Sequence, residues 1–467
     1  MVSSTAGVGR RGPSSPGHVF GDQASVARLS SCAPQERATR HACTVDSTTP
    51  TDLSPVTAAD VAAAAVRLRE VALRSPLERN GRLSELLGAD IWFKREDLQP
   101  VRSYKLRGAY NFIASLTDAE RAAGVVCASA GNHGQGVAYT CRRLGVACRI
   151  VLPRTTPRQK REQIKALGGE ETTIVVEGHT YDDAQDAATT LAASIGAVLV
   201  PPFDDALVIA GQGTVALEII EQLGRPPDLL VVPVGGGGLL AGCAVACAGT
   251  TPRPRVVGVE PAGAASMRAA LDAGGPVTLG AIDSFVDGAA VRRAGAYTFG
   301  LIRSLVDHVM TVAEGAVCTT MLQLYQRDGI IAEPAGALAV TALASGLAVP
   351  SGGSVVCIVS GGNNDVSRYG EVVERSLVHE GLKHYFLVEF PQEPGALRGF
   401  LDNVLGPSDD ITLFEYVKKN NREIGPALVG IELAATSDLD PLLARIDASG
   451  LHIERLSAGS PAFRFLV

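Results

Sequence analysis

The chain has 467 residues, of which 46% are hydrophobic, and its formal net charge is −7. This length suggests two to four domains with sizeable buried cores. Basic residues form no stripe and no patch interleaved with aromatic residues, so we expect no nucleic-acid partner. No unbroken apolar run reaches the roughly 18 residues that span a bilayer, so we expect no membrane partner.

The nine cysteines are odd in number and include no C-x-x-C pair. Several lie inside apolar runs, for example Cys357 within residues 355–358. Such cysteines are typical of small buried hydrophobic residues in a reducing compartment. We therefore expect a cytoplasmic protein.

Residues 1–52 are rich in Ser, Thr, Pro, Gly and Arg and have no hydrophobic period. This composition predicts a disordered N-terminal extension. The segment has no apolar signal-peptide core. Arg10 and Arg11 precede the first acidic residue, Asp22, so a transit peptide and a mis-assigned start codon are alternative interpretations.

Residues 53–372 alternate short apolar runs with alanine-rich segments, which is the pattern of an α/β fold. Short continuous apolar runs are typical of parallel strands that are covered on both faces. Helices such as 214–223 and 239–248 are expected between the strands, and no internal repeat is evident. The predicted strands are 125–128, 148–152, 173–176, 229–234, 256–259 and 355–359.

The pattern changes after a predicted linker at 373–382. Residues 383–467 predict the order βαββαβ, which is that of a ferredoxin-like unit. The size of this unit suits a small regulatory or interaction module. The expected elements are a strand at 384–390, a helix at 394–405, strands at 411–418 and 427–433, a helix at 438–449 and a strand at 452–457.

Lys105 is the first candidate for chemistry. Only 7 of the 42 basic residues are lysines, so the chain otherwise uses arginine for positive charge. An amine can lose its proton and form a Schiff base with an aldehyde, whereas a guanidinium cannot. The alternative, a solvated surface lysine, is disfavoured by three further segments that suit a phosphorylated ligand.

The first of these segments is a glycine cluster that follows a predicted strand and opens a predicted helix. Glycines let backbone N–H groups approach an anion, and a helix N-terminus favours negative charge. The spacing fits neither the dinucleotide fingerprint nor a Walker loop, which favours a phosphorylated cofactor over NAD or ATP. The predicted phosphate cradle consists of Gly235, Gly236, Gly237, Gly238 and Leu239.

The second segment, residues 129–136, also lies between a predicted strand and a helix. Its small residues and exposed amides suit the capture of a carboxylate, and Asn132 can donate to an oxygen of a cofactor ring. For the His133 side chain, a structural role is favoured over acid–base chemistry. The predicted substrate-binding residues are Ser129, Ala130, Gly131, Asn132 and His133.

The third segment, residues 360–364, closes the predicted strand 355–359. Polar groups at the carboxyl ends of strands line the crevice in which α/β folds bind ligands. Ser360 offers a neutral hydroxyl to a heteroatom, and no G-x-S-x-G elbow marks it as a nucleophile. Glu333 precedes another helix, and its carboxylate either faces the crevice or caps that helix.

Together these segments resemble the fold-type II pyridoxal-phosphate enzymes, and in particular the threonine ammonia-lyases (threonine dehydratases). Residues 94–109 are similar to the family's Schiff-base segment, and residues 129–136 to its substrate-carboxylate loop. Residues 211–214, 235–239 and 360–363 fit the same pattern. The resemblance implies a tryptophan-synthase-β-like fold with two open parallel sheets, and it covers residues from about 55 to the end.

The resemblance also implies the reaction and the roles. Pyridoxal 5'-phosphate is expected on Lys105, which then acts as the general base in the deamination of L-threonine, and possible use of L-serine stays open. Asn132 is expected to orient the ring oxygen, and Ser360 to bond the pyridine nitrogen. The glycine loop 235–239 is expected to hold the phosphate.

The tail sharpens this assignment. Residues 384–387, 391–397 and 414–422 resemble the single ACT-like domain of short biosynthetic threonine ammonia-lyases. This implies isoleucine biosynthesis, with isoleucine and valine as candidate effectors, and a homotetramer. The module argues against two alternatives on the same fold, a catabolic serine/threonine dehydratase and a serine racemase. An intact Lys105 argues against a non-catalytic amino-acid sensor.

No constellation of Cys and His with the spacing of a metal site is present. Some serine racemase and dehydratase relatives bind a divalent cation through a Glu-Pro segment with an acidic residue six positions on. Here Glu260 and Pro261 are followed by Ser266 at that position. We therefore expect no metal.

Overall fold

The computed structural model describes residues 55–418, 421–457, 460, 462–463 and 466. The expected disordered extension, residues 1–52, lies outside the described residues, as do Cys32 and Cys43. The seven cysteines within the described ranges are free and buried, as their apolar neighbours predict.

Six strands form the larger sheet, in the order β1-β2-β10-β7-β8-β9. Neighbouring strands are parallel except for β1 and β2, which are antiparallel. The strands are β1 (Leu77–Arg79), β2 (Asp90–Arg95), β7 (Leu229–Pro233), β8 (Arg255–Pro261), β9 (His308–Val312) and β10 (Ser354–Val359).

The central strands of this sheet are buried on both faces. Along β10, Val355 and Cys357 enter one hydrophobic core, whereas Val356 and Ile358 enter the other. Successive side chains of a strand point to opposite faces, so a continuous apolar run supplies two cores at once. This explains why β7 and β10 have no polar alternation in the sequence.

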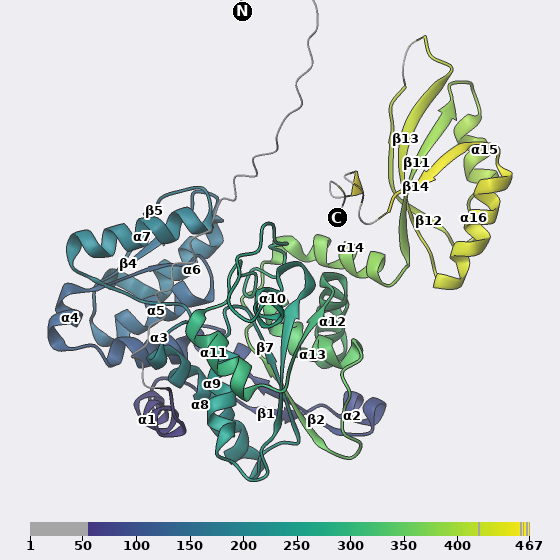
Figure 1. Ribbon diagram of the computed structural model, residues 1–467. Helices are drawn as coiled ribbons and strands as arrows, with labels where there is room; N and C mark the ends of the chain where they lie inside the picture. The colour runs from purple at the N-terminus through teal and green to yellow at the C-terminus, as the bar shows by residue number, and fades with distance from the viewer. Residues whose placement is uncertain (1–54, 419–420, 458–459, 461, 464–465, 467) are drawn as a thin grey trace, which may run out of the picture. The chain divides into compact units, whose positions relative to one another are not determined.

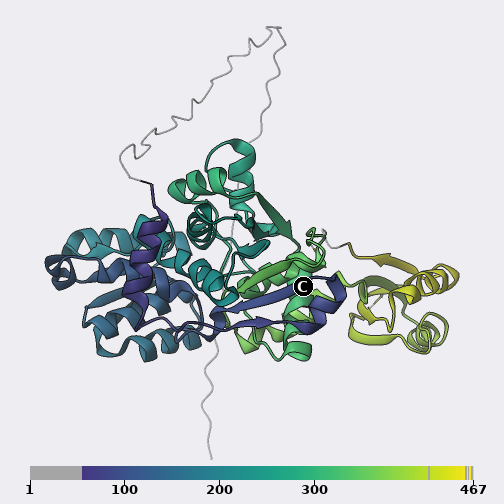
Figure 2. The same cartoon turned by 90° about the horizontal axis from the view of Figure 1, so that it is seen from below.

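Helices cover both faces of the larger sheet (Figure 1). One core is closed by α12 and α13, and the opposite core by α1, α8 and α9. The purple α1 runs in front of the blue and teal helices in Figure 2, and it contacts α8 and α9. These helices are α1 (Ala58–Leu68), α8 (Ala206–Leu223), α9 (Gly238–Ala248), α12 (Glu314–Asp328) and α13 (Pro334–Ala344).

A second, entirely parallel sheet has the order β5-β4-β3-β6. Helices also flank this smaller sheet, and α5 packs against α3 and α6. Its strands are β3 (Val125–Ala128), β4 (Cys148–Leu152), β5 (Thr172–Val176) and β6 (Val198–Leu199). Its helices are α3 (Lys105–Ala114), α4 (Asp118–Ala123), α5 (Asn132–Leu144), α6 (Arg158–Gly168) and α7 (Tyr181–Ile195).

Helix α8 is long and apolar enough, by length and composition, to cross a membrane. In the structure it packs against α1, α3 and α9, and more than half of the residues of its apolar window are buried. It also carries Glu218, which is ion-paired with Arg107 and Lys94. These contacts are those of a core helix, a class that passes the same test.

Residues 383–418 and 421–457 include an antiparallel four-stranded sheet in the order β12-β13-β11-β14. Numbered along this segment, the strand order is 2-3-1-4, as in a ferredoxin-like unit. Its core includes Phe386, Phe390 and Phe400. The elements are β11 (Lys383–Pro391), α15 (Ala396–Asn403), β12 (Asp410–Tyr416), β13 (Ile424–Glu432), α16 (Leu439–Ala448) and β14 (His452–Arg455).

The remaining helices are α2 (Gly81–Leu87), α10 (Ser266–Ala273), α11 (Ala296–Leu305) and α14 (Tyr369–His379). Helix α14 occupies much of the segment that the sequence predicts as a linker. It packs on α12, and its Ser376 hydroxyl lies 2.9 Å from that of Thr319. Glu374 of α14 is ion-paired with Lys383, at the start of β11.

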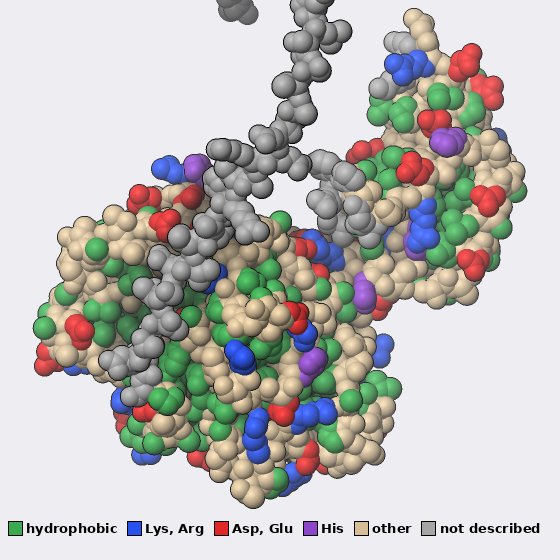
Figure 3. Space-filling view, viewed as in Figure 1, with side chains coloured by type: hydrophobic (Ala, Val, Ile, Leu, Met, Phe, Trp, Pro, Cys, Tyr) green, Lys and Arg blue, Asp and Glu red, His purple; other side chains and the backbone are tan. Residues whose placement is uncertain are grey.

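The α/β fold and the ferredoxin-like module are therefore both confirmed. Each of the strands predicted in the first 372 residues is present within two residues of its expected bounds. The predicted order βαββαβ is also present. On the face visible in Figure 3, Lys and Arg side chains are interspersed with Asp and Glu.

Candidate active site

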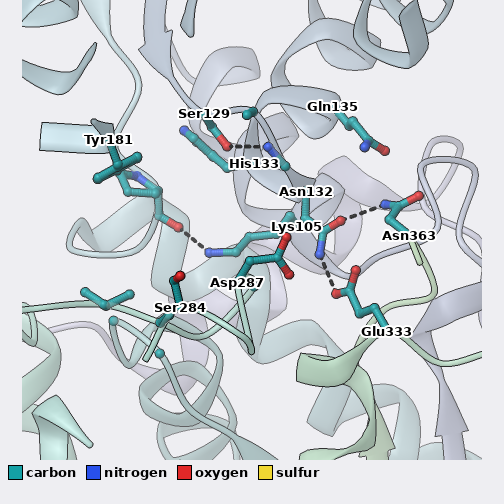
Figure 4. Close-up of a pocket in the computed structure, with 18 of the residues that line it drawn as sticks. Lys105, Ser129, Asn132, His133, Gln135, Tyr181, Ser284, Asp287, Glu333 and Asn363 are labelled. Carbon is teal, nitrogen blue, oxygen red and sulfur yellow. Dashed lines mark hydrogen bonds between the residues drawn. The ribbon is translucent and has the colours of Figure 1, made fainter. Parts of the chain in front are cut away.

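A cavity of about 1680 Å³ lies where strands of both parallel sheets end. Its lining includes residues within three positions after the ends of β3, β6, β7 and β10, together with the first residue of α3. Ligands of open α/β sheets bind beyond the carboxyl ends of the strands, so this is the expected place for a site. Figure 4 shows the side chains that converge there.

Lys105 is the first residue of α3, and its side chain lines the cavity. Its Nζ donates a hydrogen bond to the backbone oxygen of Pro202 at 2.8 Å. Burial lowers the pKa of the Lys105 amine to about 8, although the nearby Glu333 charge opposes this shift. A lysine with this pKa is unprotonated, and therefore nucleophilic, far more often at neutral pH than an exposed lysine.

A buried ion network holds α3 in place. Arg107, two residues after Lys105, pairs with Glu96 at 2.8 Å and with Glu218 at 2.6 Å. Lys94 pairs with the other oxygen of Glu218 at 2.6 Å. Because these charges are matched and hydrogen-bonded, the network links β2 and η1 (Glu96–Leu98), which precede α3, to α8 behind it. The position of Lys105 is thereby tied to the larger sheet.

The glycine loop lies between β7 and α9 and lines the same cavity. Gly237 has a φ of +95°, a conformation that side chains rarely adopt. A Cβ on Gly236 would lie 2.3 Å from the ring of Phe203. Glycine is therefore required at both positions, and the backbone N–H groups at the start of α9 stay open to an anion.

The substrate loop predicted at 129–133 also lines the cavity. Ser129 accepts a hydrogen bond from the backbone N–H of Gly131 at 3.2 Å, and Asn132 is the first residue of α5. His133 Nε2 lies 3.0 Å from the backbone oxygen of Val200. Burial, together with the charge of Lys105, lowers the pKa of His133 to about 3, so the ring is neutral. These contacts fit the structural role expected for His133.

The side chain of Asn132 is hydrogen-bonded to two residues far along the chain, Glu333 before α13 and Asn363 after β10. It donates from Nδ2 to Glu333 at 2.5 Å and accepts at Oδ1 from Asn363 at 2.6 Å. Figure 4 shows both contacts. Glu333 makes no side-chain capping hydrogen bond to α13 within the described chain, and it lines the cavity. Of the two alternatives left open by the sequence, the structure therefore has the carboxylate facing the crevice.

Ser360 lies apart from the other predicted residues. It is buried behind the cavity wall, where its hydroxyl donates to the backbone oxygen of Ala335 at 3.3 Å. Its neighbours Gly362 and Asn363 are among the described lining residues, whereas Ser360 itself is not. Its assignment to a ring nitrogen stays a prediction.

Several lining residues were not singled out in the sequence. Phe203 covers the glycine loop, and Asp287 and Lys160 form an ion pair of 2.6 Å at the cavity. Asp287 lies between α10 and α11, where no local pattern marks it. Lys160 could have been singled out from the sequence, since few of the chain's basic residues are lysines.

Within the described ranges, no three His, Cys, Asp or Glu side chains gather in a way that could hold a metal ion. Glu260, the first residue of the Glu-Pro segment, accepts from the backbone N–H groups of Met267 and Arg268 at 2.8 Å each. Burial raises the pKa of Glu260 to about 7. The carboxylate oxygens of Glu260 therefore accept hydrogen bonds from the backbone at the start of α10.

The donor set fits a phosphorylated aldehyde. A buried amine with a lowered pKa and a glycine-lined helix N-terminus line one cavity. The amine can hold an aldehyde carbon, and the helix N-terminus can hold a phosphate. Asn363 Oδ1 is a buried acceptor without a hydrogen-bond partner in the described chain, as is usual for a group that meets a ligand.

Comparison with known protein families agrees with this reading of the cavity. Residues 68–361 match the family described as pyridoxal-phosphate dependent enzyme. Residues 374–466 match the family described as the C-terminal regulatory domain of threonine dehydratase. The two matches cover the part with the two parallel sheets and the ferredoxin-like part.

Individual relatives are similar over nearly their whole length. The biosynthetic L-threonine dehydratase IlvA of Mycobacterium tuberculosis is 60% identical over 417 residues, which are 89% of this chain and 97% of the relative. The protein of the same name from Bacillus subtilis is 49% identical over 400 residues, 86% of this chain and 95% of the relative.

Solved structures share the fold. The processed form of threonine deaminase isoform 2 from Solanum lycopersicum has a TM-score of 0.64 and 39% identity, over 69% of this chain and 96% of its own. Maize serine racemase has a TM-score of 0.64 and 30% identity, over 70% of this chain and 99% of its own. The chain belongs to the pyridoxal-phosphate-dependent enzymes and, within them, to the biosynthetic L-threonine dehydratases.

Proposed function

We propose that this protein converts L-threonine to 2-oxobutanoate and ammonia, the first step of isoleucine biosynthesis, with Lys105 as its catalytic residue. The observation that carries the proposal is the Lys105 amine, which is buried, has a pKa lowered to about 8 and lines the same cavity as the glycine loop. The relatives named L-threonine dehydratase support the substrate and the reaction.

Different residues of the chain bind the cofactor, bind the substrate carboxylate and accept the proton. Lys105 holds pyridoxal phosphate, and the backbone of residues 235–239 binds its phosphate. When bound, the cofactor supplies the electron sink for the reaction. The loop 129–133 binds the substrate carboxylate. The Lys105 amine then accepts the Cα proton as general base, which its lowered pKa favours at neutral pH.

The reaction balances without an oxidant or a metal. Loss of the Cα proton and of the β-hydroxyl removes one water from threonine and leaves an enamine. Hydrolysis of that enamine uses one water and releases 2-oxobutanoate and ammonia. The cavity wall needs only to orient the substrate and to move a proton at Lys105 Nζ, as the contacts of that residue allow.

The test is the replacement Lys105→Ala, measured as 2-oxobutanoate release from L-threonine. General acid–base catalysis contributes roughly 10²–10⁴-fold, so we expect at least this loss, together with loss of the visible absorption of bound cofactor. Lys165→Ala is the matched control, because Lys165 donates to the backbone oxygens of Gly169 and Thr172 and does not line the cavity within the described chain. Normal turnover by Lys105→Ala would refute the mechanism.

We further propose that the module at 383–467 is an ACT-like regulatory domain through which isoleucine inhibits the enzyme, with valine as a second effector. The match to the regulatory domain of threonine dehydratase supports this assignment. An effector changes activity only if it binds two states with different affinity. Removal of residues 380–467 should preserve turnover and abolish isoleucine inhibition, and inhibition of the truncated protein would contradict the assignment.

The same resemblance supports a catalytic domain at 53–372, a linker at 373–382 and a cytoplasmic homotetramer. Sedimentation of the purified protein tests the assembly. Serine racemase activity is a second candidate, favoured by the 30% identity to the maize enzyme. Chiral analysis after incubation with L-serine tests it, since D-serine would indicate a racemase and pyruvate alone a dehydratase.

A further inference from the structure

Glu333 is a buried acid that the mechanism above does not use. Its residue is only 5% exposed, and its side chain reaches the cavity from the start of α13. Space around it is tight, since a Cβ on Gly361 would lie 2.3 Å from Glu333 Oε1. Glu333 is therefore confined to one place, where its carboxyl group accepts a hydrogen bond from Asn132 at 2.5 Å.

This contact sets the direction of the Asn132 amide. Asn363 donates from Nδ2 both to the backbone oxygen of Val101, at 2.8 Å, and to Asn132 Oδ1, at 2.6 Å. Asn132 Oδ1 must accept there, so its Nδ2 must point to Glu333. One hydrogen of Nδ2 is used by Glu333, and the other is available to a ligand in the cavity.

The charge on Glu333 depends on groups from several elements. Burial and, to a lesser extent, the charge of Asp287 raise the pKa of Glu333 to about 7, against the opposing effects of the hydrogen bond from Asn132 and the charge of Lys160. Figure 4 draws Asp287 between Lys105 and Glu333. The titratable and charged groups near it are Lys105 and Tyr104 at the start of α3, Asp287 between α10 and α11, and, paired with Asp287, Lys160 of α6 and Arg368.

We propose that Glu333 is a positioning residue for the deamination. Glu333 aims the Asn132 amide at the cofactor, and the ion pair between Asp287 and Lys160 controls whether Glu333 carries a proton. This inference rests on the proposed function, because Asn132 is there expected to orient the ring oxygen. When Glu333 is neutral, the second Nδ2 hydrogen of Asn132 points to the ring oxygen of the cofactor with no negative charge beside it. An ionised Glu333 places a negative charge beside it and changes the electronic environment of the ring.

Substitutions of the two ion-pair residues should shift the titration of Glu333 in opposite directions. Asp287→Asn removes a negative charge near Glu333, which favours the ionised carboxylate and moves its titration to lower pH. Lys160→Gln removes a positive charge and moves the titration to higher pH. A purely structural role of the ion pair would make the two variants alike, since either substitution breaks it.

The experiment is a pH titration of the visible absorption spectrum of the full-length enzyme loaded with pyridoxal phosphate. We expect a spectral step near pH 7 in the unmodified protein and its loss in Glu333→Gln. Its midpoint should fall by roughly one pH unit in Asp287→Asn and rise by a similar amount in Lys160→Gln. The pH dependence of kcat should follow the same order.

Arg292→Gln is the matched control, because Arg292 forms another ion pair at the cavity, with Asp182 at 3.3 Å, and is not among the main influences on the pKa of Glu333. Its midpoint should equal that of the unmodified protein. A step that persists in Glu333→Gln, or that moves in the same direction in Asp287→Asn and Lys160→Gln, overturns the inference. Lys105→Ala separates this outcome from failure of the proposed function, which would appear as cofactor absorption that is independent of Lys105.

Discussion

Glu96 and Glu333 are two buried acids near the start of α3, and their environments differ. Burial acts to raise the pKa of Glu96, but the charges of Arg107 and Lys94 lower it below its usual range. For Glu333 the largest influence on the pKa after burial is instead the negative charge of Asp287, and this pKa rises to about 7. Burial alone therefore does not set the charge of an acid; the scaffold acid is matched by cations, and the cavity acid is left close to its titration point.

The largest expected effect on stability comes from removing the cation that neutralises the buried Glu96. Arg107→Met leaves Glu96 and Glu218 without their main cation, and removal of one partner of a buried ion pair costs about 3–5 kcal/mol. The free energy of unfolding, from denaturant titration followed by circular dichroism, should fall by that amount. A loss under 1 kcal/mol would show that the network is not the support of α3.

A smaller effect is expected at Glu333. Its pKa is about 7 when folded and near 4.5 when unfolded, so ionisation destabilises the fold as the pH rises through this window. Glu333→Gln removes the ionisable group. The stability of the variant relative to the unmodified protein should therefore improve between pH 5 and pH 8 by on the order of 2–3 kcal/mol, measured by denaturant titration at both pH values. An equal difference at both pH values would contradict the raised pKa.

His133 tests whether every buried titratable group near Lys105 takes part in proton transfer. Its pKa is lowered to about 3, so it cannot change charge in the working range. His133→Gln should reduce kcat by less than the roughly 10²-fold that general acid–base catalysis contributes, and the pH profile of kcat should keep its midpoints. Loss of one limb of that profile would assign His133 an acid–base role.

The smallest effect is expected at an exposed ion pair. Arg158 and Glu162 lie one turn apart on the surface of α6, at 2.6 Å. Such exposed pairs contribute little because solvent screens the two charges, so Arg158→Gln should leave the free energy of unfolding, measured by the same denaturant titration, almost unchanged. This variant is the control for Arg107→Met, since both remove an arginine from an ion-paired site, which is buried for Arg107 and exposed for Arg158.

The fold was largely predictable because its information is local. Continuous apolar runs such as 229–233 and 355–359 predict strands buried on both faces, and the structure has them as β7 and β10. The helix α14 was missed as a helix, since a charged amphipathic segment between two domains has the composition of a linker. The residues of β9 (His308–Val312) were also not singled out, because polar His308 and Thr311 interrupt the apolar pattern.

The candidate site was predictable where residue type alone indicates chemistry. Lys105 and the glycine loop are such cases, and the structure has them in one cavity. The contact between Asn132 and Glu333 joins residues 201 positions apart, and its partner Asn363 is 231 positions from Asn132. No local sequence pattern indicates that residues so far apart in the sequence are in contact. Asp287 is further hidden, because its effect on Glu333 appears only when the loop that carries it is folded.

The scarcity of lysine has a practical consequence for chemical labelling. Lys94 is buried and donates to three acceptors, and Lys160 is ion-paired with Asp287. Lys165 donates to two backbone oxygens. Before residue 380 this leaves Lys105 as the amine with both a lowered pKa and a place in a cavity. A small amine-reactive aldehyde or active ester, used near neutral pH on cofactor-free protein, should acylate or trap this position with little background from the rest of the catalytic region.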